Sequence, residues 1–167
     1  MAMPWKDRIS VALLGFFLVV ALTVELYWLL HGPHLAALAD TSFIANLFRI
    51  YGDCDRAYYD TLTPLSLVLE GLNVYVTQLL NLVLIYAIWK RRPYRYALQL
   101  AISSYLSYSV VLYFLTAHVA DYAGMRYRSG WTYFLFYGVN LPWLAGHLYL
   151  AWDAFVAVTR RFQATAS

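Results

Sequence analysis

Residues 9–30 read ISVALLGFFLVVALTVELYWLL, an apolar run in which Glu25 is the one charged side chain. The hydrocarbon core of a bilayer is about 30 Å thick, so a helix that rises 1.5 Å per residue needs about 20 apolar residues to cross it. The run is long enough to cross, and it is too long for the core of a cleaved signal peptide. We predict a retained membrane-spanning helix over residues 9–30.

Three further stretches reach the same length, at residues 64–89, 96–119 and 131–155. The composition agrees, because 62% of the chain is hydrophobic and only 13% is charged, against about 25% charged in soluble proteins. We therefore predict an all-α integral membrane protein. It is one domain over residues 1–167, a bundle of four transmembrane helices with a ligand cavity inside the membrane. In the longer connection, residues 35–50 have a pattern that predicts a short helix at the membrane surface.

The positive residues gather on one predicted side of the membrane. Lys and Arg resist translocation, so the side that carries more of them is the cytoplasmic one. The N-terminus, the connection between the second and third spans, and the C-terminus carry Lys6, Arg8, Lys90, Arg91, Arg92, Arg95, Arg160 and Arg161. Both termini are expected in the cytoplasm and, in a eukaryote, the membrane is expected to be the endoplasmic reticulum.

The composition also indicates which partners to expect. The cationic residues lie at helix ends rather than along one face, so we predict no nucleic-acid partner. Cys54 is the single cysteine and has no neighbouring CxxC or Cys/His pair, so neither a disulfide nor a metal site is expected. We expect no cofactor. The expected partners are the bilayer, a hydrophobic small molecule and, as an option, a second copy of the chain.

Two glutamates lie inside predicted spans. An ionisable side chain there costs about 2.5–3.5 kcal/mol on insertion scales, so it is kept only where it faces protein or a cavity. Glu25 comes about five residues before the non-cytoplasmic end of its span, and Glu70 about six residues after the start of its own. Both then lie roughly 8–9 Å below that boundary. We predict that the two carboxyl groups share one pocket.

Polar residues recur at helical spacing on the predicted spans. They are Glu70, Asn73, Thr77 and Asn81 on the second, Gln99, Ser103 and Ser107 on the third, and Phe136, Asn140, Trp143 and His147 on the fourth. For Thr77, Asn81, Ser103, Ser107 and His147 we favour hydrogen bonds that hold the bundle together. For the glutamates we favour function.

Three segments carry a resemblance to a known family: RPYRYALQL at residues 92–100, VLYFLTAH at 111–118 and YFLFYGVNLPW at 133–143. With the spacing from Glu70 to Pro93, they make the chain similar to the emopamil-binding protein family. These membrane proteins share the EXPERA domain and include the sterol Δ8–Δ7 isomerase. The resemblance covers about residues 13–155.

The resemblance implies that Glu25 and Glu70 flank the ligand, with help from Asn140 and Trp143. The chain also departs from the family isomerase. Ala21 stands where that enzyme has a pocket histidine, Asn73 matches a threonine, and Val110 matches an aspartate. The fold and the cavity carry over more strongly than the sterol reaction, and the room left by Ala21 favours a different substrate or outcome.

The pair of glutamates indicates acid/base chemistry on an alkene. One carboxyl group would protonate a double bond, aromatic faces would stabilise the cation, and the second carboxylate would remove another proton. The same groups would start a terpenoid cyclisation or open an epoxide. A protein that only binds sterols or cationic amphiphiles is the other class. The candidate residues are Glu25 and Glu70 for catalysis, and Asn73, Asn140, Trp143, Tyr108, Tyr137 and Ala21 for substrate binding.

The neighbours of each glutamate suggest its role. Asn73 follows Glu70 by one helical turn and is expected to orient it, while Ala21 and Leu22 give Glu25 an apolar setting. We therefore expect Glu25 to keep its proton and act as the acid, and Glu70 to accept a proton as the base.

Overall fold

The computed structural model describes residues 3–166, and every regular element in that range is helical. Four helices are long and apolar enough to cross a membrane: Trp5–His34, Pro64–Trp89, Arg95–Val119 and Gly130–Ala164. The predicted all-α membrane fold with four spans is confirmed. The first and last helices continue past their apolar runs into the basic segments at the chain ends.

Two of the four membrane helices contain a π-helical turn. In chain order the elements are α1 (Trp5–Val20), η1 (Ala21–Glu25, π), α2 (Leu26–His31), η2 (Gly32–His34, 3₁₀), α3 (Phe43–Tyr51), η3 (Arg56–Tyr58, 3₁₀), α4 (Pro64–Gly71), η4 (Leu72–Thr77, π), α5 (Gln78–Trp89), α6 (Arg95–Val119) and α7 (Gly130–Ala166). The first span runs from α1 to η2, and the second from α4 to α5. The third is α6 and the fourth belongs to α7.

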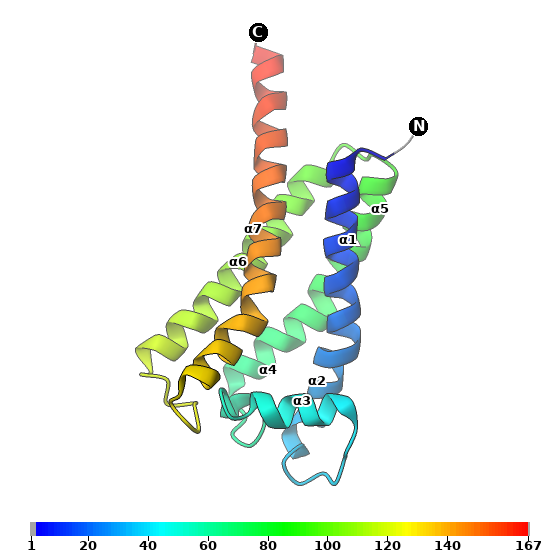
Figure 1. Ribbon diagram of the computed structural model, residues 1–167. Helices are drawn as coiled ribbons and strands as arrows, with labels where there is room; N and C mark the ends of the chain where they lie inside the picture. The colour runs from blue at the N-terminus through cyan, green and yellow to red at the C-terminus, as the bar shows by residue number, and fades with distance from the viewer. Residues whose placement is uncertain (1–2, 167) are drawn as a thin grey trace.

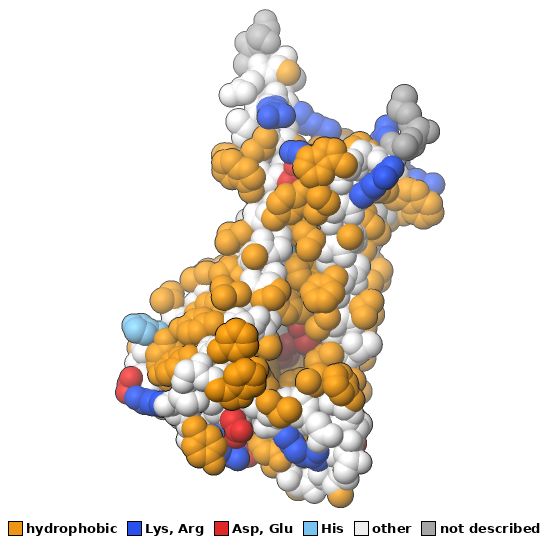
Figure 2. Space-filling model, viewed as in Figure 1, with side chains coloured by type: hydrophobic (Ala, Val, Ile, Leu, Met, Phe, Trp, Pro, Cys, Tyr) orange, Lys and Arg blue, Asp and Glu red, His pale blue; other side chains and the backbone are white. Residues whose placement is uncertain are grey.

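Both chain ends lie at the same end of the bundle, and α3 lies across the other end (Figure 1). Helices α6 and α7 form the most extensive helix pair, and α5 contacts both α1 and α6. Their shared core includes Leu14, Phe17, Leu84, Ile102 and Leu150. Outward-facing Leu, Val and Phe side chains form a hydrophobic band between the two ends, where Lys and Arg gather (Figure 2). This surface suits a bilayer.

Ion pairs fasten the helices at the end that carries the termini. Arg95 Nη1 of α6 lies 2.9 Å from Asp7 Oδ2 of α1, and both side chains are largely buried. Lys6 Nζ lies 3.2 Å from Asp153 Oδ1 of α7. The first span is thereby linked to the third and the fourth.

At the opposite end, the connections between spans form a cap. The surface helix expected over residues 35–50 is shorter than predicted and begins only at Phe43, as α3. The Ser42 side chain fixes this start, because it caps the helix by accepting a hydrogen bond from Ala45 N–H. The backbone N–H of Arg56 donates to Gly124 O at 2.9 Å, which joins the two long connections. Trp28 Nε1 donates to Tyr58 O at 2.8 Å. The cap thus holds Tyr58 against the end of the bundle.

Candidate active site

The two glutamates lie at π-helical turns that pack against each other. Glu25 ends η1, and Glu70 comes shortly before η4. A π-turn adds a residue to a helical turn, interrupts the regular 3.6-residue spacing and is frequent at functional sites. Both turns fall within membrane spans. The contact between them brings the helix segments that carry the two glutamates together.

A cavity of about 80 Å³ opens between these turns. Five of the predicted site residues line it together: Glu25, Glu70, Asn73, Asn140 and Trp143. The remaining wall includes Tyr58, Tyr105, Tyr113 and His147. Acidic atoms are visible in a hollow of the hydrophobic band (Figure 2).

A row of amide side chains leads to Glu25. Asn81 Nδ2 donates to Gln78 Oε1 at 3.0 Å, Gln78 Nε2 donates to Asn73 Oδ1 at 3.1 Å, and Asn73 Nδ2 donates to Glu25 Oε2 at 2.5 Å. The expectation that Asn73 orients Glu70 is therefore wrong. The expected apolar setting of Glu25 is wrong for the same reason. Because η4 is π-helical, residues five apart in the sequence lie on the same face, so Asn73 pairs with Gln78. On that face Asn73 points across the helix interface toward Glu25.

Glu70 receives its hydrogen bond from the cap. Tyr58 Oη donates to Glu70 Oε1 at 2.8 Å. Burial raises the pKa of Tyr58 well above its usual value, and the charge of Glu70 adds to the shift, so the phenol keeps its proton and remains a donor. Tyr58 is not among the site residues predicted from the sequence. Its only signal is a tyrosine-rich connection, and residue order does not show that this connection folds over the cavity.

A second hydrogen-bonded row begins at Asn140. Its Nδ2 donates to Tyr51 Oη at 3.0 Å, and the hydroxyls of Tyr51 and Tyr113 lie 2.9 Å apart. Tyr113 in turn donates to Asp55 of the cap. Asn140 is thus held by the cap as well as by its own helix.

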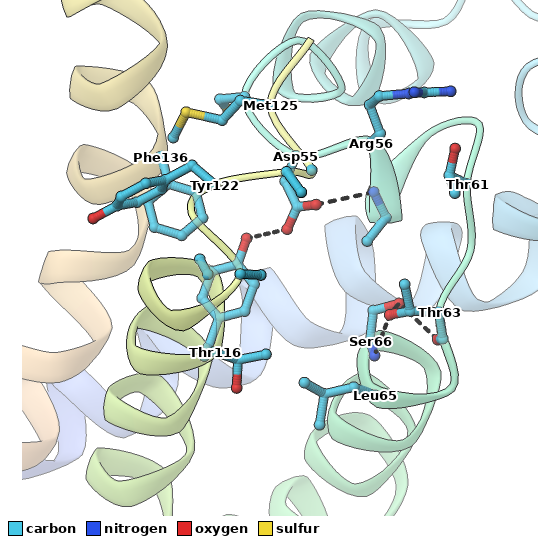
Figure 3. Close-up of a pocket in the computed structure, with 17 residues that line it drawn as sticks. Asp55, Arg56, Thr61, Thr63, Leu65, Ser66, Thr116, Tyr122, Met125 and Phe136 are labelled. Atoms are coloured by element: carbon cyan, nitrogen blue, oxygen red, sulfur yellow. Dashed lines mark hydrogen bonds between the residues drawn. The ribbon is translucent and has the colours of Figure 1, made fainter. Parts of the chain in front are cut away.

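A larger cavity of about 330 Å³ lies beside the first, toward the cap (Figure 3). Its wall is mainly apolar and includes Met125 and Phe136, with Thr63, Ser66 and Asp55 among the polar groups. Asp55 accepts hydrogen bonds from Tyr113 Oη and from Ala57 N–H, and burial raises the pKa of its carboxyl group. Tyr113 lines both cavities, so it forms the partition between them.

Three predicted binding residues lie outside the glutamate cavity. The Tyr108 side chain is 63% exposed on the outer face of α6. Tyr137 packs on Phe114, and its hydroxyl lies 2.6 Å from that of Tyr122. Ala21 is fully buried in η1. Nothing in this arrangement supports a direct contact with a ligand for any of the three.

His147 lines the cavity and is fully buried. Its ring stacks on Phe17 with centroids 4.3 Å apart. Neither ring nitrogen has a hydrogen-bond partner among the described residues, so the expected bond within the bundle is not present.

Metal-binding residue types do not converge at this site. Within residues 3–166, no three His, Cys, Asp or Glu side chains gather in a set that could hold a metal ion. Cys54 is a buried free thiol in the cap, and burial raises its pKa to about 12. A thiol that stays protonated is neither a nucleophile nor a ready ligand.

Residues 43–154 match the EXPERA family, described as the expanded EBP superfamily. The match covers more than half of the chain and includes α3 and most of the last three spans. The chain belongs to the EXPERA family. The family assignment expected from the sequence is confirmed.

Curated relatives of this EXPERA protein carry several activities in their names. It is 35% identical to isomeliandiol synthase of Ailanthus altissima over 108 aligned residues. The aligned stretch makes up 65% of this chain and 50% of the relative. It is 30% identical over 127 residues to protoglabretal synthase of Citrus sinensis, covering 73% and 58%. It is 28% identical over 141 residues to the 3-beta-hydroxysteroid-Δ8,Δ7-isomerase of Cavia porcellus, covering 84% and 60%. The chain spans about half the length of these relatives.

Proposed function

We propose that this EXPERA protein is a membrane enzyme that rearranges an isoprenoid or sterol-like substrate by proton transfer. The observation that carries the proposal is that two carboxyl groups line one cavity, Glu25 at the end of the π-turn η1 and Glu70 two residues before the π-turn η4. They are the only two glutamates in the chain. Relatives named as a Δ8,Δ7-isomerase, an isomeliandiol synthase and a protoglabretal synthase support an enzyme of this family.

The proposed reaction has two proton transfers. One carboxyl group gives its proton to one carbon of an alkene, which leaves a carbocation on the neighbouring carbon. The other carboxylate then takes a proton from a carbon beside the cation, and the electrons of that C–H bond form the new double bond. If a second double bond of the substrate attacks the cation first, a ring closes and the charge moves to the far carbon of that bond, beside which the carboxylate then removes a proton. If a substrate hydroxyl oxygen attacks instead, a ring also closes and the carboxylate takes the hydroxyl proton. An epoxide would be opened in the same way, by protonation of its oxygen.

The environment of the pair suits one shared proton. Two carboxyl groups that face one apolar cavity cannot both be ionised without strong repulsion, so one keeps its proton. Each group also accepts one hydrogen bond, Glu25 from Asn73 and Glu70 from Tyr58. These donors hold both side chains toward the cavity. Since each glutamate accepts one hydrogen bond, this count does not favour the ionised form of one glutamate over that of the other. Either glutamate can therefore start as the acid.

Aromatic rings surround the place where positive charge would develop. Trp143 and Tyr105 line the cavity with the two glutamates. The negative face of an aromatic ring attracts a cation by about 0.5–2 kcal/mol, and more strongly where water is excluded. We propose that these rings stabilise the carbocation between the two proton transfers.

The substrate needs more room than the glutamate cavity has. A volume of about 80 Å³ is small against the roughly 300–1,000 Å³ of pockets that enclose drug-sized ligands. The neighbouring cavity of about 330 Å³ is mainly apolar and shares Tyr113 with the first. We propose that the substrate displaces the Tyr113 ring and places its apolar remainder in the larger cavity.

A non-enzymatic binder is the second candidate. A carboxylate among aromatic rings is also a receptor for a cationic amphiphile, and the same cavity supplies both. The two candidates differ in turnover, because a binder releases its ligand unchanged.

Replacement of each glutamate tests the proposal. Glu25→Gln and Glu70→Gln keep the side-chain shape but cannot transfer a proton, so each variant should lose turnover by about 100-fold or more. Both should still bind an amphipathic amine or sterol. The readout is the conversion of isoprenoid lipids by purified protein in lipid nanodiscs, followed by mass spectrometry.

Asp121→Asn serves as the matched control, because it makes the same acid-to-amide change on a side chain that is 83% exposed. It should behave as the wild type. Full activity in both glutamate variants would rule out the acid/base mechanism and leave the binder.

A further inference from the structure

His147 occupies the end of the glutamate cavity that is farther from the cap. It lies seven residues after Asn140 on α7, and its ring stacks on Phe17, which lies eight residues before Glu25 on the first span. At 1.5 Å per residue, the imidazole lies roughly 10 Å along the bundle axis from the depth of Glu25 and Asn140. The cavity therefore has polar groups at both of its ends: the two carboxyl groups at the end near the cap, and the imidazole at the end farther from the cap.

The surroundings hold the imidazole in place without satisfying it. Phe17 stacks on both His147 and Trp143, with ring centroids 4.3 and 4.5 Å apart. Gly146 permits this contact, because a Cβ there would lie 2.6 Å from Phe17 Cζ. Neither Nδ1 nor Nε2 of His147 has a partner in the described part of the chain. The same is true of the buried hydroxyl of Ser107 on α6, the helix that pairs with α7.

An unpaired buried imidazole costs free energy, because its polar atoms have given up water without a replacement. Buried polar groups are nearly always hydrogen-bonded, so a cavity-lining exception points to a ligand atom that completes it. A neutral imidazole has one N–H donor and one acceptor nitrogen. A hydroxyl group, which is also both donor and acceptor, complements either ring nitrogen.

We infer that His147 is a specificity-determining residue that binds a hydroxyl group of the substrate, carried on the skeleton roughly 10 Å from the bond on which the glutamates act. This inference rests on the proposed function and makes the substrate class narrower: an elongated, hydroxylated isoprenoid. Its hydroxyl end lies beside Phe17 and His147, its reacting bond lies between the glutamates, and its apolar remainder extends toward the larger cavity.

The test compares substrates that differ only in hydroxylation. The probes are Δ8 sterols that carry a hydroxyl group at one end of the skeleton, at the other end, at both ends or at neither. The wild type should prefer one hydroxylated member by about 10-fold or more in KM over the sterol that lacks it. His147→Phe keeps the ring stack but removes both polar atoms, so it should abolish this preference while kcat stays within about threefold. His147→Gln, which restores a donor and an acceptor, should recover part of the preference.

His118→Phe provides the matched control, because His118 is exposed at the end of α6. It should keep the wild-type preference. An unchanged preference in His147→Phe would overturn the inference. A uniform loss of kcat on every probe would also overturn it, because that result would assign His147 to the chemistry or to the fold rather than to recognition.

Binding to the Glu70→Gln variant separates this inference from the proposed function. That variant is expected to bind without turnover, so the dissociation constants of the four sterols measure the hydroxyl preference alone. If Glu25→Gln and Glu70→Gln convert isoprenoid lipids as fast as the wild type, but the binding preference depends on His147, the proposed function fails and the recognition site stands. If conversion depends on the glutamates but no preference depends on His147, the recognition site fails alone.

Discussion

At the scale of single residues, Glu70 depends on a side chain from outside its own helix. Tyr58 belongs to the cap, and three contacts hold it there: Trp28 Nε1 donates to its carbonyl oxygen, and the rings of Trp28 and Tyr51 pack against its own ring. Its hydroxyl then has one partner, Glu70. Tyr58 is therefore a positioning residue, because it acts on the substrate only through the carboxyl group that it orients.

Tyr58→Phe should slow turnover while leaving substrate binding nearly unchanged. A hydrogen bond to a charged group is worth about 1.5–3 kcal/mol, so we expect kcat to fall by about 10- to 100-fold and KM to change by less than about threefold. Tyr59→Phe is the control, since within residues 3–166 the Tyr59 hydroxyl makes no hydrogen bond to a residue that lines the cavity. Equal kcat values for the Tyr58 and Tyr59 variants would show that this hydrogen bond does not serve the reaction.

Residue order predicted which side chains meet but not all of their hydrogen bonds. Glu25, Glu70, Asn140 and Trp143 line one cavity, as their depths and the family resemblance suggested. Asn73 lines it too, but it pairs with the other glutamate. The reason is local: a stripe drawn at 3.6 residues per turn assumes a regular helix, and the π-turn after Gly71 shifts the alignment by about one residue.

At the scale of helices, the close approach of the first span to α7 shapes the deep end of the cavity. Gly146 lets the Phe17 ring lie against α7, where it stacks on Trp143 and His147. Phe17 is also part of the main core cluster. A side chain at position 146 would therefore disturb both the core and the cavity wall.

Gly146→Ala should lower stability and Gly138→Ala should not. The new methyl group at position 146 would meet Phe17 Cζ at 2.6 Å, and such overpacking costs about 1–3 kcal/mol of the free energy of unfolding. At position 138 the nearest atom is 3.9 Å away, so alanine should gain up to about 1 kcal/mol from its better helix propensity. Thermal unfolding of both variants in the same detergent measures the difference. A Gly146→Ala variant at least as stable as Gly138→Ala would contradict this packing.

At the scale of the whole molecule, the four spans were predictable because length and hydropathy decide membrane crossing almost alone. The cap was not. Its contacts, such as Arg56 N–H to Gly124 O and Arg126 Nη2 to Asp60 Oδ2 at 2.6 Å, join segments far apart in the sequence, and no periodic pattern records them. This cap positions Tyr58 and Tyr51 and encloses the larger cavity. None of the three could be predicted without it.

The positive-residue count predicts that both termini lie in the cytoplasm. Both chain ends lie at one end of the bundle (Figure 1), which agrees with the prediction that they share one side of the membrane. Reporter domains fused at the C-terminal end and inserted within residues 121–130 should therefore report opposite sides, with the C-terminal one cytoplasmic. Reporters on the same side would contradict the four-span topology, and a reversed result would contradict the orientation alone.

The proposed mechanism requires that a proton pass from a glutamate to a carbon atom of the substrate, and deuterium labelling measures that step. Membranes that contain the protein are incubated in D₂O with isoprenoid lipids, and the deuterium content of the products is measured by mass spectrometry. A carboxyl proton exchanges with the solvent, so the wild-type product should gain one deuterium on a carbon atom, and neither Glu25→Gln nor Glu70→Gln should form it above about one hundredth of the wild-type rate. A product that carries no deuterium on carbon would contradict the protonation of an alkene, and a product that forms equally well in both variants would contradict the acid/base role of the glutamate pair.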